Sequence, residues 1–306
     1  MEHRPLIIIA ALIMLAFAAT LVLRNTGKLE GLELKAYDSY LGLADDLEGP
    51  HEPIVMVEYT ESDEAAFGYP LPDASLAKLL AQLAADEPVA IGLDLIRDRP
   101  EPQVEDTTAF DDLSSIFRDH PSIVGTMKGG SGAFGPPPAL EDRPFQVGSV
   151  AILTEPDGRT RRGLLNIDEG EAVPRPSLAL LLATRYLASN DVPIDRSPDG
   201  RLTLGSSTIS PLRPQETGFY SPSANLDGGD QFLLNFPACA SGFERHQIKE
   251  ILDDPDSLDV DGRIVLIGNT VRAAKDVFDV PLVCAGMTDD KMFGVHLHGQ
   301  IISQLI

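Results

Sequence analysis

Three carboxylates in this sequence occupy positions where acid–base or ligand-binding chemistry is possible. Glu58, Asp94 and Asp276 each lie at or just after the end of a segment that we predict to be a strand. In open α/β sheets this is the edge at which binding sites form. Paired carboxylates there can exchange protons, although such acids more often cap helices or fix loops. Asp94 interrupts the apolar run VAIGLDLI, so we expect a buried carboxylate with hydrogen-bond partners whose loss on Asp94→Ala would cost about 1–3 kcal/mol.

Two histidines near the end of the sequence have a spacing that a metal site could use. His296 and His298 would share one face of a strand and could ligate a metal together with a distant carboxylate. At a junction between strand and helix, however, one hydrogen-bonded and one exposed histidine is the ordinary interpretation. The sequence has no GxxxxGK[ST], no GxSxG and no HExxH, and the glycines at 129–135 follow Lys128 instead of preceding it, which disfavours a nucleotide-binding loop. We therefore predict no catalytic residue, no metal site and no cofactor.

The cysteine content bears on the compartment of the protein. Cys239 and Cys284 are the two cysteines of the sequence, too few for a thiolate zinc site. They can form a disulfide if the domain lies outside the cytoplasm, and are expected to be free thiols if it lies inside.

The amino-terminal segment is long and apolar enough to cross a membrane. An uncharged run begins at Leu6 and ends at Leu23, between Arg4 and Arg24. A helix of this length covers about 27 Å, close to the hydrocarbon thickness of a bilayer. The large residues that precede Arg24 do not suit a signal peptidase, so we predict an uncleaved anchor. The basic residues that flank the span oppose an extracytoplasmic domain, and the charge rule weakens when a long domain follows.

The composition of the chain excludes several classes of partner. The formal net charge is -23 and the 24 basic residues are scattered, so nucleic acid and anionic lipid are poor partners for the soluble surface. Aromatic residues make up 6% of the chain and tryptophan is absent, which disfavours a carbohydrate groove lined with rings.

Apolar runs of strand length alternate with helical patterns along the soluble part. Residues 54–58 and 89–95 read as strands, and the leucines at 76, 79, 80 and 83 mark one face of a helix between them. This βαβ unit predicts a parallel pair of strands. Further strands are predicted at 122–127, 145–153, 232–236 and 264–268, a buried helix at 176–188, and a hairpin with loops at 190–230.

The order of these segments resembles the type-two CHASE domain, an extracytoplasmic sensory domain of bacterial cyclases, histidine kinases and serine/threonine kinases. The span, the strand IVMVE, the Tyr69 to Pro72 stretch, the leucine helix and AIGLDL all occur in the family's order. Later matches are Asp157-Gly158 with Arg161-Arg162, Pro176-Ser177-Leu178-Ala179, Asn235-Phe236-Pro237, RIVLIGNT followed by Asp276, Phe278 and Pro281-Leu282, and Gly294-Val295 with His298.

The sequence departs from the family pattern at three polar positions. Thr60, followed by Glu61, stands where the family usually has an aspartate. Asp73 replaces a common arginine, and Val280 replaces a threonine. If these positions shape a ligand pocket, the resemblance implies a changed or lost ligand.

The resemblance implies an α/β domain with a mainly parallel central sheet and helices on both faces, preceded by one transmembrane helix. We expect an anchor at residues 1–24 and a sensor domain at residues 25–306, with the output part missing. The implied role is the input module of a receptor in the cell inner membrane, with its soluble domain in the periplasm or extracellular. It would be a homodimer in the full receptor and would sense a small ligand or envelope component. Candidate ligand-binding or structural residues are Glu58, Glu61, Asp94, Asp276 and His298.

Two other classes of function remain open on the sequence alone. One is a membrane-anchored hydrolase that uses Asp94, Asp276 and His298, which would require these groups to converge in a cleft. The other is a non-catalytic envelope interaction protein, which an exposed apolar patch without a pocket would favour. The last residues, with an apolar stripe through Ile302 and Leu305, predict a helix that packs beside the strand at 264–268.

Overall fold

The computed structural model describes residues 4–26, 28–41, 53–103, 105–130, 132–168, 174–198, 201–213, 229–239, 242–282, 284 and 287–306. The chain divides into two compact units. One comprises residues 1–44 and 212–227, and the other comprises residues 45–211 and 228–306.

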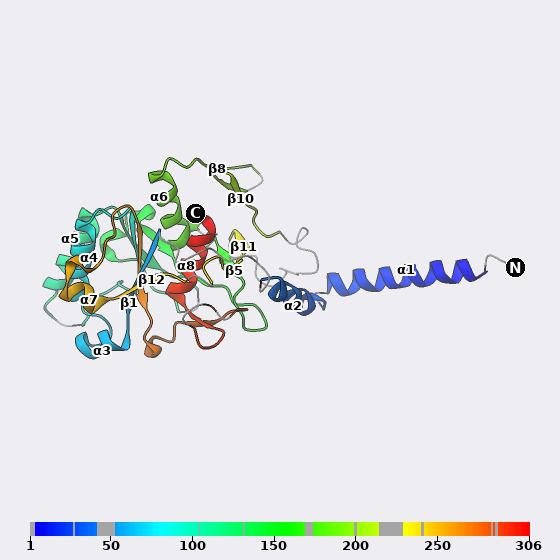
Figure 1. Cartoon of the computed structure of the whole chain (residues 1–306), viewed down its shortest axis with the longest axis horizontal. Helices are drawn as coiled ribbons and strands as arrows, with labels where there is room; N and C mark the ends of the chain where they lie inside the picture. Colours follow the sequence, from blue (N-terminus) through cyan, green and yellow to red (C-terminus); the bar gives the residue numbers. More distant parts are fainter. Residues whose placement is uncertain are drawn as a thin grey trace. The chain divides into compact units, whose positions relative to one another are not determined.

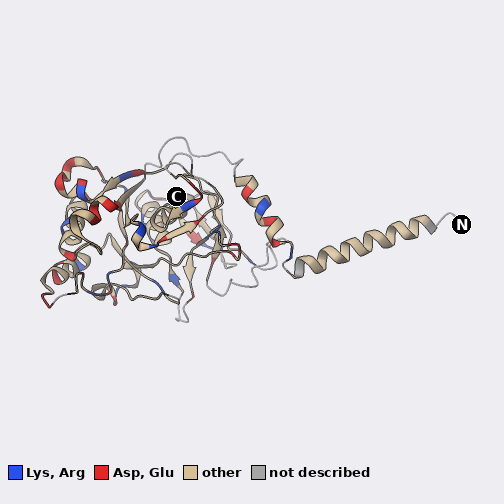
Figure 2. Ribbon diagram, turned by 90° about the horizontal axis from the view of Figure 1, so that it is seen from below, with Lys and Arg blue, Asp and Glu red and all other residues tan. Residues whose placement is uncertain are grey.

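The first unit contains the predicted membrane span. Helix α1 (Arg4–Asn25) is followed by helix α2 (Glu30–Leu41). Within α1, the stretch Pro5–Leu23 is long and apolar enough to cross a bilayer, and its side chains are not buried. In Figure 2 the ribbon of this stretch is tan, the colour of residues that are neither acidic nor basic. Among the described residues, this is the one helix that could span a membrane, as predicted, while the domain boundary at residue 24 stays a prediction.

The second unit is built on a parallel sheet. Its strands are β1 (Ile54–Tyr59), β2 (Ala90–Asp94), β3 (Ile123–Met127), β4 (Val147–Ser149), β12 (Glu244–Gln247) and β13 (Ile264–Asn269). The described residues place them in the order β12-β1-β13-β2-β3-β4, and every neighbouring pair is parallel. The central strands are buried along nearly their whole length, as strands covered on both faces must be.

Helices cover both faces of this sheet, as Figure 1 shows. Helices α4 (Asp73–Ala85), α5 (Thr108–Asp119) and α7 (Ile248–Asp253) pack on one face and share a hydrophobic core with it. Helices α6 (Leu178–Ser189) and α8 (Gly294–Leu305) pack against each other and on the other face. The predicted fold class is therefore confirmed.

The order of the strands differs from the simplest interpretation of the βαβ unit. Strands β1 and β2 are parallel, but β13 lies between them and pairs with both. β13 has the sequence IVLIGN, which suits the most deeply buried position in a parallel sheet. Strand order depends on contacts between distant segments, so the local pattern could not reveal this insertion.

Several peripheral elements also differ from expectation. The predicted strand at 145–153 begins as a 3-10 turn (Pro144–Gln146) before β4. The predicted strand at 232–236 is β11 (Gln231–Leu233), which pairs antiparallel with β5 (Arg162–Leu164) outside the central sheet. In place of the expected hairpin, the structure has a three-stranded sheet of β8 (Ile194–Arg196), β9 (Leu202–Leu204) and β10 (Ser207–Ile209). Residues 214–228 of the predicted segment lie outside the described residues.

The smaller elements are α3 (Glu61–Phe67), β6 (Asn166–Ile167), β7 (Arg175–Pro176), β14 (Val277–Asp279) and β15 (Lys291–Phe293).

Helix α8 lies unusually close to the sheet because glycines line the contact. A Cβ atom added at Gly268 in β13 would lie 2.6 Å from Cβ of Val295. A Cβ atom added at Gly299 would collide with Met56 of β1. Ile301, Ile302 and Leu305 are buried, so the predicted docking of the last helix beside β13 is confirmed.

Replacing Ile302 by Asp should destabilise this domain by roughly 3 kcal/mol or more, because it places an unpaired charge at a fully buried position. The matched control is Ile194→Asp, since Ile194 in β8 is 39% exposed and should change stability little. Chemical denaturation of the full chain in detergent micelles measures both. Equal effects of the two substitutions would contradict the docking of α8.

Candidate functional site

A cavity of about 220 Å³ lies at the carboxyl edge of the central sheet. Asp94 ends β2, Asn269 ends β13, and Thr126 lies near the end of β3. Asp276 enters from the segment before β14, and His298 enters from α8. The remaining polar lining residues are Tyr69 and Lys128, and the apolar walls include Leu95, Ile96, Phe134, Val150, Ile152 and Phe278. The structure thus brings together Asp94, Asp276 and His298, which the sequence analysis selected separately.

Buried polar atoms without hydrogen-bond partners gather around this cavity. They are Oδ2 of Asp94, Oγ1 of Thr126, Oδ1 of Asn269 and Nδ1 of His298. The side chains of Thr126 and His298 are only 1% and 2% exposed. A buried polar atom left without any partner costs about 1–3 kcal/mol, so these four atoms favour a partner that occupies the cavity.

The carboxyl group of Asp94 does not have the partners that the sequence analysis expected. No hydrogen bond or ion pair joins it to any described residue, and it projects from the end of β2 toward the cavity. The expectation of hydrogen-bond partners is therefore wrong, and with it the reason given for a loss of stability on Asp94→Ala. A buried carboxyl group that contributes no contact to the fold is available to a ligand.

Burial and charge together set the protonation of the cavity. Burial raises the pKa of Asp94 to about 7, and Lys128 opposes this rise. Burial also raises the pKa of Asp276, with repulsion from Asp94 as the next cause. Burial lowers the pKa of His298, and the nearby Asp276 opposes that change. At neutral pH the imidazole is therefore uncharged, and the two carboxyl groups do not ionise together readily.

The start of α8 fixes the position of Asp276. The N–H of Gly294, the first residue of α8, donates to the backbone oxygen of Asp276 over 3.1 Å. A Cβ atom added at Gly294 would lie 2.9 Å from Oδ1 of Asp276, so a side chain here would displace the carboxyl group. His298 lies four residues further on and therefore on the same side of the helix.

The other two acidic candidates lie outside this cavity. Oε1 of Glu58 is 2.6 Å from Nε2 of His296 and 3.5 Å from Nε of Arg245. Glu61 is in the first turn of α3, where its carboxylate accepts the N–H of Arg272 over 3.4 Å. His296 is hydrogen-bonded as predicted, but the expectation that the other histidine is exposed is wrong. Positions two apart on a helix point to different sides, and α8 is buried on both.

The three departures from the family pattern also lie away from the cavity lining. Thr60 caps α3, where its N–H donates to Oδ2 of Asp63 over 2.8 Å. Asp73 accepts the N–H of Glu101 over 2.7 Å and pairs with Arg97 at 3.3 Å. Val280 is fully buried. None of the three residues lines the cavity.

The two adjacent arginines after the turn at residue 158 are structural. The guanidinium of Arg161 donates to both carboxylate oxygens of Asp157, over 2.9 and 2.8 Å. Arg162 is buried and donates to both oxygens of Glu155, over 2.7 and 3.0 Å, and to Gln231 over 2.6 Å. Such bidentate arginine–carboxylate pairs fix the geometry of the segment that contains β5.

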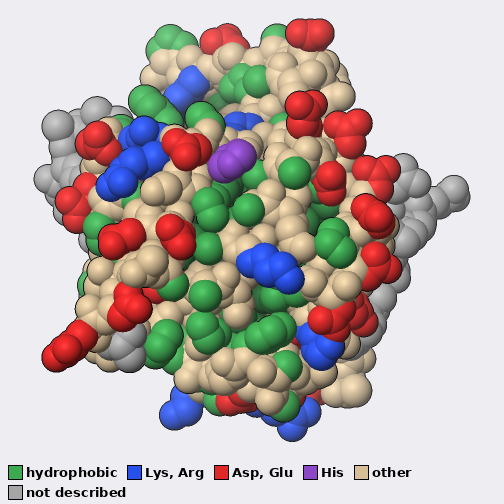
Figure 3. Space-filling view, turned by 90° about the vertical axis from the view of Figure 1, so that its left-hand side faces the viewer, with side chains coloured by type: hydrophobic (Ala, Val, Ile, Leu, Met, Phe, Trp, Pro, Cys, Tyr) green, Lys and Arg blue, Asp and Glu red, His purple; other side chains and the backbone are tan. Residues whose placement is uncertain are grey.

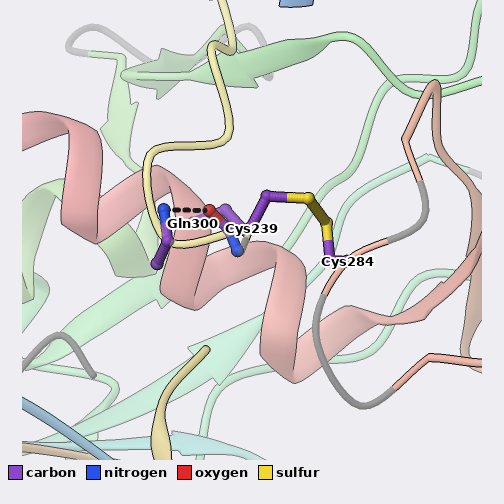
Figure 4. The surroundings of a disulfide bond; sticks show 4 residues. Cys239, Cys284 and Gln300 are labelled. Atoms are coloured by element: carbon purple, nitrogen blue, oxygen red, sulfur yellow. Dashed lines mark hydrogen bonds between the residues drawn. A yellow bond between two sulfur atoms is a disulfide. The ribbon is translucent and has the colours of Figure 1, made fainter. Parts of the chain in front are cut away.

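A disulfide joins Cys239 and Cys284, and Figure 4 shows it beside α8. The N–H of Ala238 donates to Oε1 of Gln300 in α8 over 3.0 Å. The disulfide therefore joins two loops beside α8, the helix that contributes His298 to the cavity.

The three groups that the hydrolase alternative would use line one cavity but do not contact one another directly. No hydrogen bond or ion pair within 4.0 Å connects Asp94, Asp276 and His298, and within the described ranges no three His, Cys, Asp or Glu side chains converge as metal ligands. Figure 3 shows acidic side chains spread over the face that bears α4, α5 and α7, with basic ones in small groups only. What the cavity offers is polar groups arranged for binding.

Sequence analysis missed Thr126, Lys128 and Asn269. Each lies at or just after the end of a predicted apolar strand, so the edge rule that selected Asp94 could have found them.

Comparison with known proteins identifies one family. A family model described as the CHASE2 domain matches residues 11–306. No curated protein and no solved structure matches the chain.

The stability of the domain should depend on pH through Asp94. The pKa of Asp94 is higher in the folded protein than its ordinary value of 3.8. Its contribution to the free energy of unfolding is therefore complete below about pH 4 and is lost as the pH rises through about 7. Asp94→Asn removes this loss, which is at most about 4 kcal/mol, so the variant should melt higher than the wild type at pH 8 and similarly at pH 4. Thermal melts in detergent test this, with the exposed Asp253→Asn as control. A constant difference between Asp94→Asn and wild type across this range would refute it.

Proposed function

The chain belongs to the CHASE2 domain family, and from this premise we propose that it is the extracytoplasmic input module of a membrane-bound bacterial receptor. CHASE2 domains are extracytoplasmic sensory domains and not catalytic ones. The observation that carries the proposal is the cavity at the carboxyl edge of the sheet, where four buried polar atoms lack partners. A ligand that supplies those partners would bind there.

Helix α8 is the element through which a bound ligand would act. Asp276 packs on its first residue, and His298 projects from its second turn into the cavity. A ligand that contacts both groups would favour one position of α8 over another on the sheet. A coupling of about 1–3 kcal/mol is enough to shift such an equilibrium. In the proposed receptor, a cyclase or kinase output and a homodimeric assembly would use this shift.

Two features support a location outside the cytoplasm. The Cys239–Cys284 disulfide is typical of oxidising compartments. The CHASE2 family, whose domains are extracytoplasmic, favours the periplasm or the exterior, with the apolar stretch Pro5–Leu23 as the tether to the inner membrane. These features favour a tethered sensor over a cytoplasmic protein.

Reporter fusions test this topology. Alkaline phosphatase fused after Ile306 should be active and a fluorescent protein fused there should be dark, because both report export of the domain. The same reporters fused before Met1 are the matched control and should give the opposite pattern. An inactive phosphatase and a fluorescent reporter protein after Ile306 would contradict the receptor role.

A further inference from the structure

We propose that the cavity at the carboxyl edge of the sheet binds a small organic cation, a primary amine whose ammonium group is held between Asp94 and Asp276. This inference rests on the proposed function only in treating the cavity as the sensing site. It adds the chemical class of the ligand, which the family assignment leaves open.

The unpartnered atoms of the cavity call for a donor of hydrogen bonds. The carboxyl oxygen of Asp94 and the amide oxygen of Asn269 accept hydrogen bonds, and the hydroxyl of Thr126 can accept one. The neutral imidazole of His298 accepts at Nδ1 when its proton is on Nε2. An ammonium group is a donor with three N–H bonds and no acceptor, so it complements this set.

The charge of the cavity favours the same ligand. The titratable groups that line it are Tyr69, Asp94, Lys128, Asp276 and His298. Burial raises the pKa of Tyr69 and lowers that of His298, so both are neutral near pH 7. When both aspartates are ionised they repel each other, and a cation bound between them relieves this repulsion.

The size and the walls of the cavity select an organic cation over a metal ion. Its volume of about 220 Å³ exceeds the needs of a bare ion and is below the roughly 300–1,000 Å³ typical of drug-sized ligands. Among the described residues, no three side chains of the metal-ligating types converge. Phe134 and Phe278 contribute aromatic walls, which suit a short apolar body and attract a cation to their faces.

Binding should release protons from the two carboxyl groups. Both have raised pKa values in the empty cavity because burial disfavours their charge. A bound ammonium group stabilises the ionised forms, so a proton leaves to the solvent as the ligand enters. Affinity should therefore increase from pH 5 to pH 8, a range in which an alkylammonium with a pKa near 10 keeps its own proton.

Calorimetric titration of the full chain in detergent micelles with butylammonium chloride tests the proposal. We expect binding at pH 8 that is at least tenfold tighter than at pH 5. Parallel titrations in two buffers of different ionisation enthalpy should show the release of protons. Butanol and sodium butyrate, which replace the ammonium by a neutral and an anionic group, should bind at least tenfold more weakly. Potassium chloride at the same ionic strength controls for screening and should give no binding.

Two variants locate the binding site. Asp94→Asn and Asp276→Asn nearly preserve shape and each remove one negative charge, so each should weaken butylammonium binding at pH 8 at least tenfold. Asp253→Asn, at an exposed aspartate in α7, should bind as the wild type does. Thermal melts confirm that each variant is folded, and the comparison of ligands on the wild type decides the proposal if one is not.

The proposal is overturned if butanol or butyrate binds as tightly as butylammonium, if affinity does not rise with pH, or if both cavity variants bind like the wild type. Absence of butylammonium binding up to the solubility limit of the salt also overturns it. None of these results alters the reporter fusions, so they leave the sensor role intact. Reversed reporters would remove the receptor role even if the cavity bound amines.

Discussion

The close approach of α8 to the central sheet is the constraint on which the site depends. Gly268 and Gly299 remove the side chains that would separate the helix from β13 and β1. The same closeness brings Gly294 onto the carboxyl group of Asp276 and puts His298 at the sheet edge beside Asp94. With ordinary side chains at these glycines the helix would lie farther out, because protein interiors are packed without spare room. The position of His298 in the cavity therefore depends on this helix–sheet contact.

Two kinds of buried polar group coexist in this domain, and the contrast between them is informative. Arg162 with Glu155 and Arg97 with Asp73 are charged pairs whose partners are provided by the fold itself. Asp94, by contrast, is left without a partner at the cavity, where it weakens folding as the pH rises. Proteins retain such local costs where function requires them, since positions that break the rules of stability cluster at functional sites.

The arrangement of rigid and adjustable parts is suited to an input module. The disulfide and the hydrogen bond between Ala238 and Gln300 hold loops against the flank of α8. Within that frame, the protonation of two carboxyl groups and one imidazole sets the charge around the first turns of the helix. A ligand that changes this charge acts directly on α8, which packs on β1 and β13. No long chain of contacts is needed to carry the effect from the cavity to this helix.

The sequence by itself determined the features that depend on local pattern. The apolar run in α1, the strands β1, β2, β3 and β13, the helices α4 and α6, and the apolar stripe of α8 all follow from hydrophobic periodicity. The edge rule for parallel sheets selected Asp94 and Asp276, and the motif containing Gly294 and His298 was recognised through family resemblance.

Only the tertiary structure decided how these parts meet. The insertion of β13 between β1 and β2, the separation of Glu58 and Glu61 from the cavity, and the absence of partners for Asp94 depend on contacts between residues far apart in the chain. Short polar segments such as α3, α7 and β12 escaped prediction because packing, and not local periodicity, holds them in place. Residue types and spacing limit what a side chain can do, whereas its partners are set by the three-dimensional path of the whole chain.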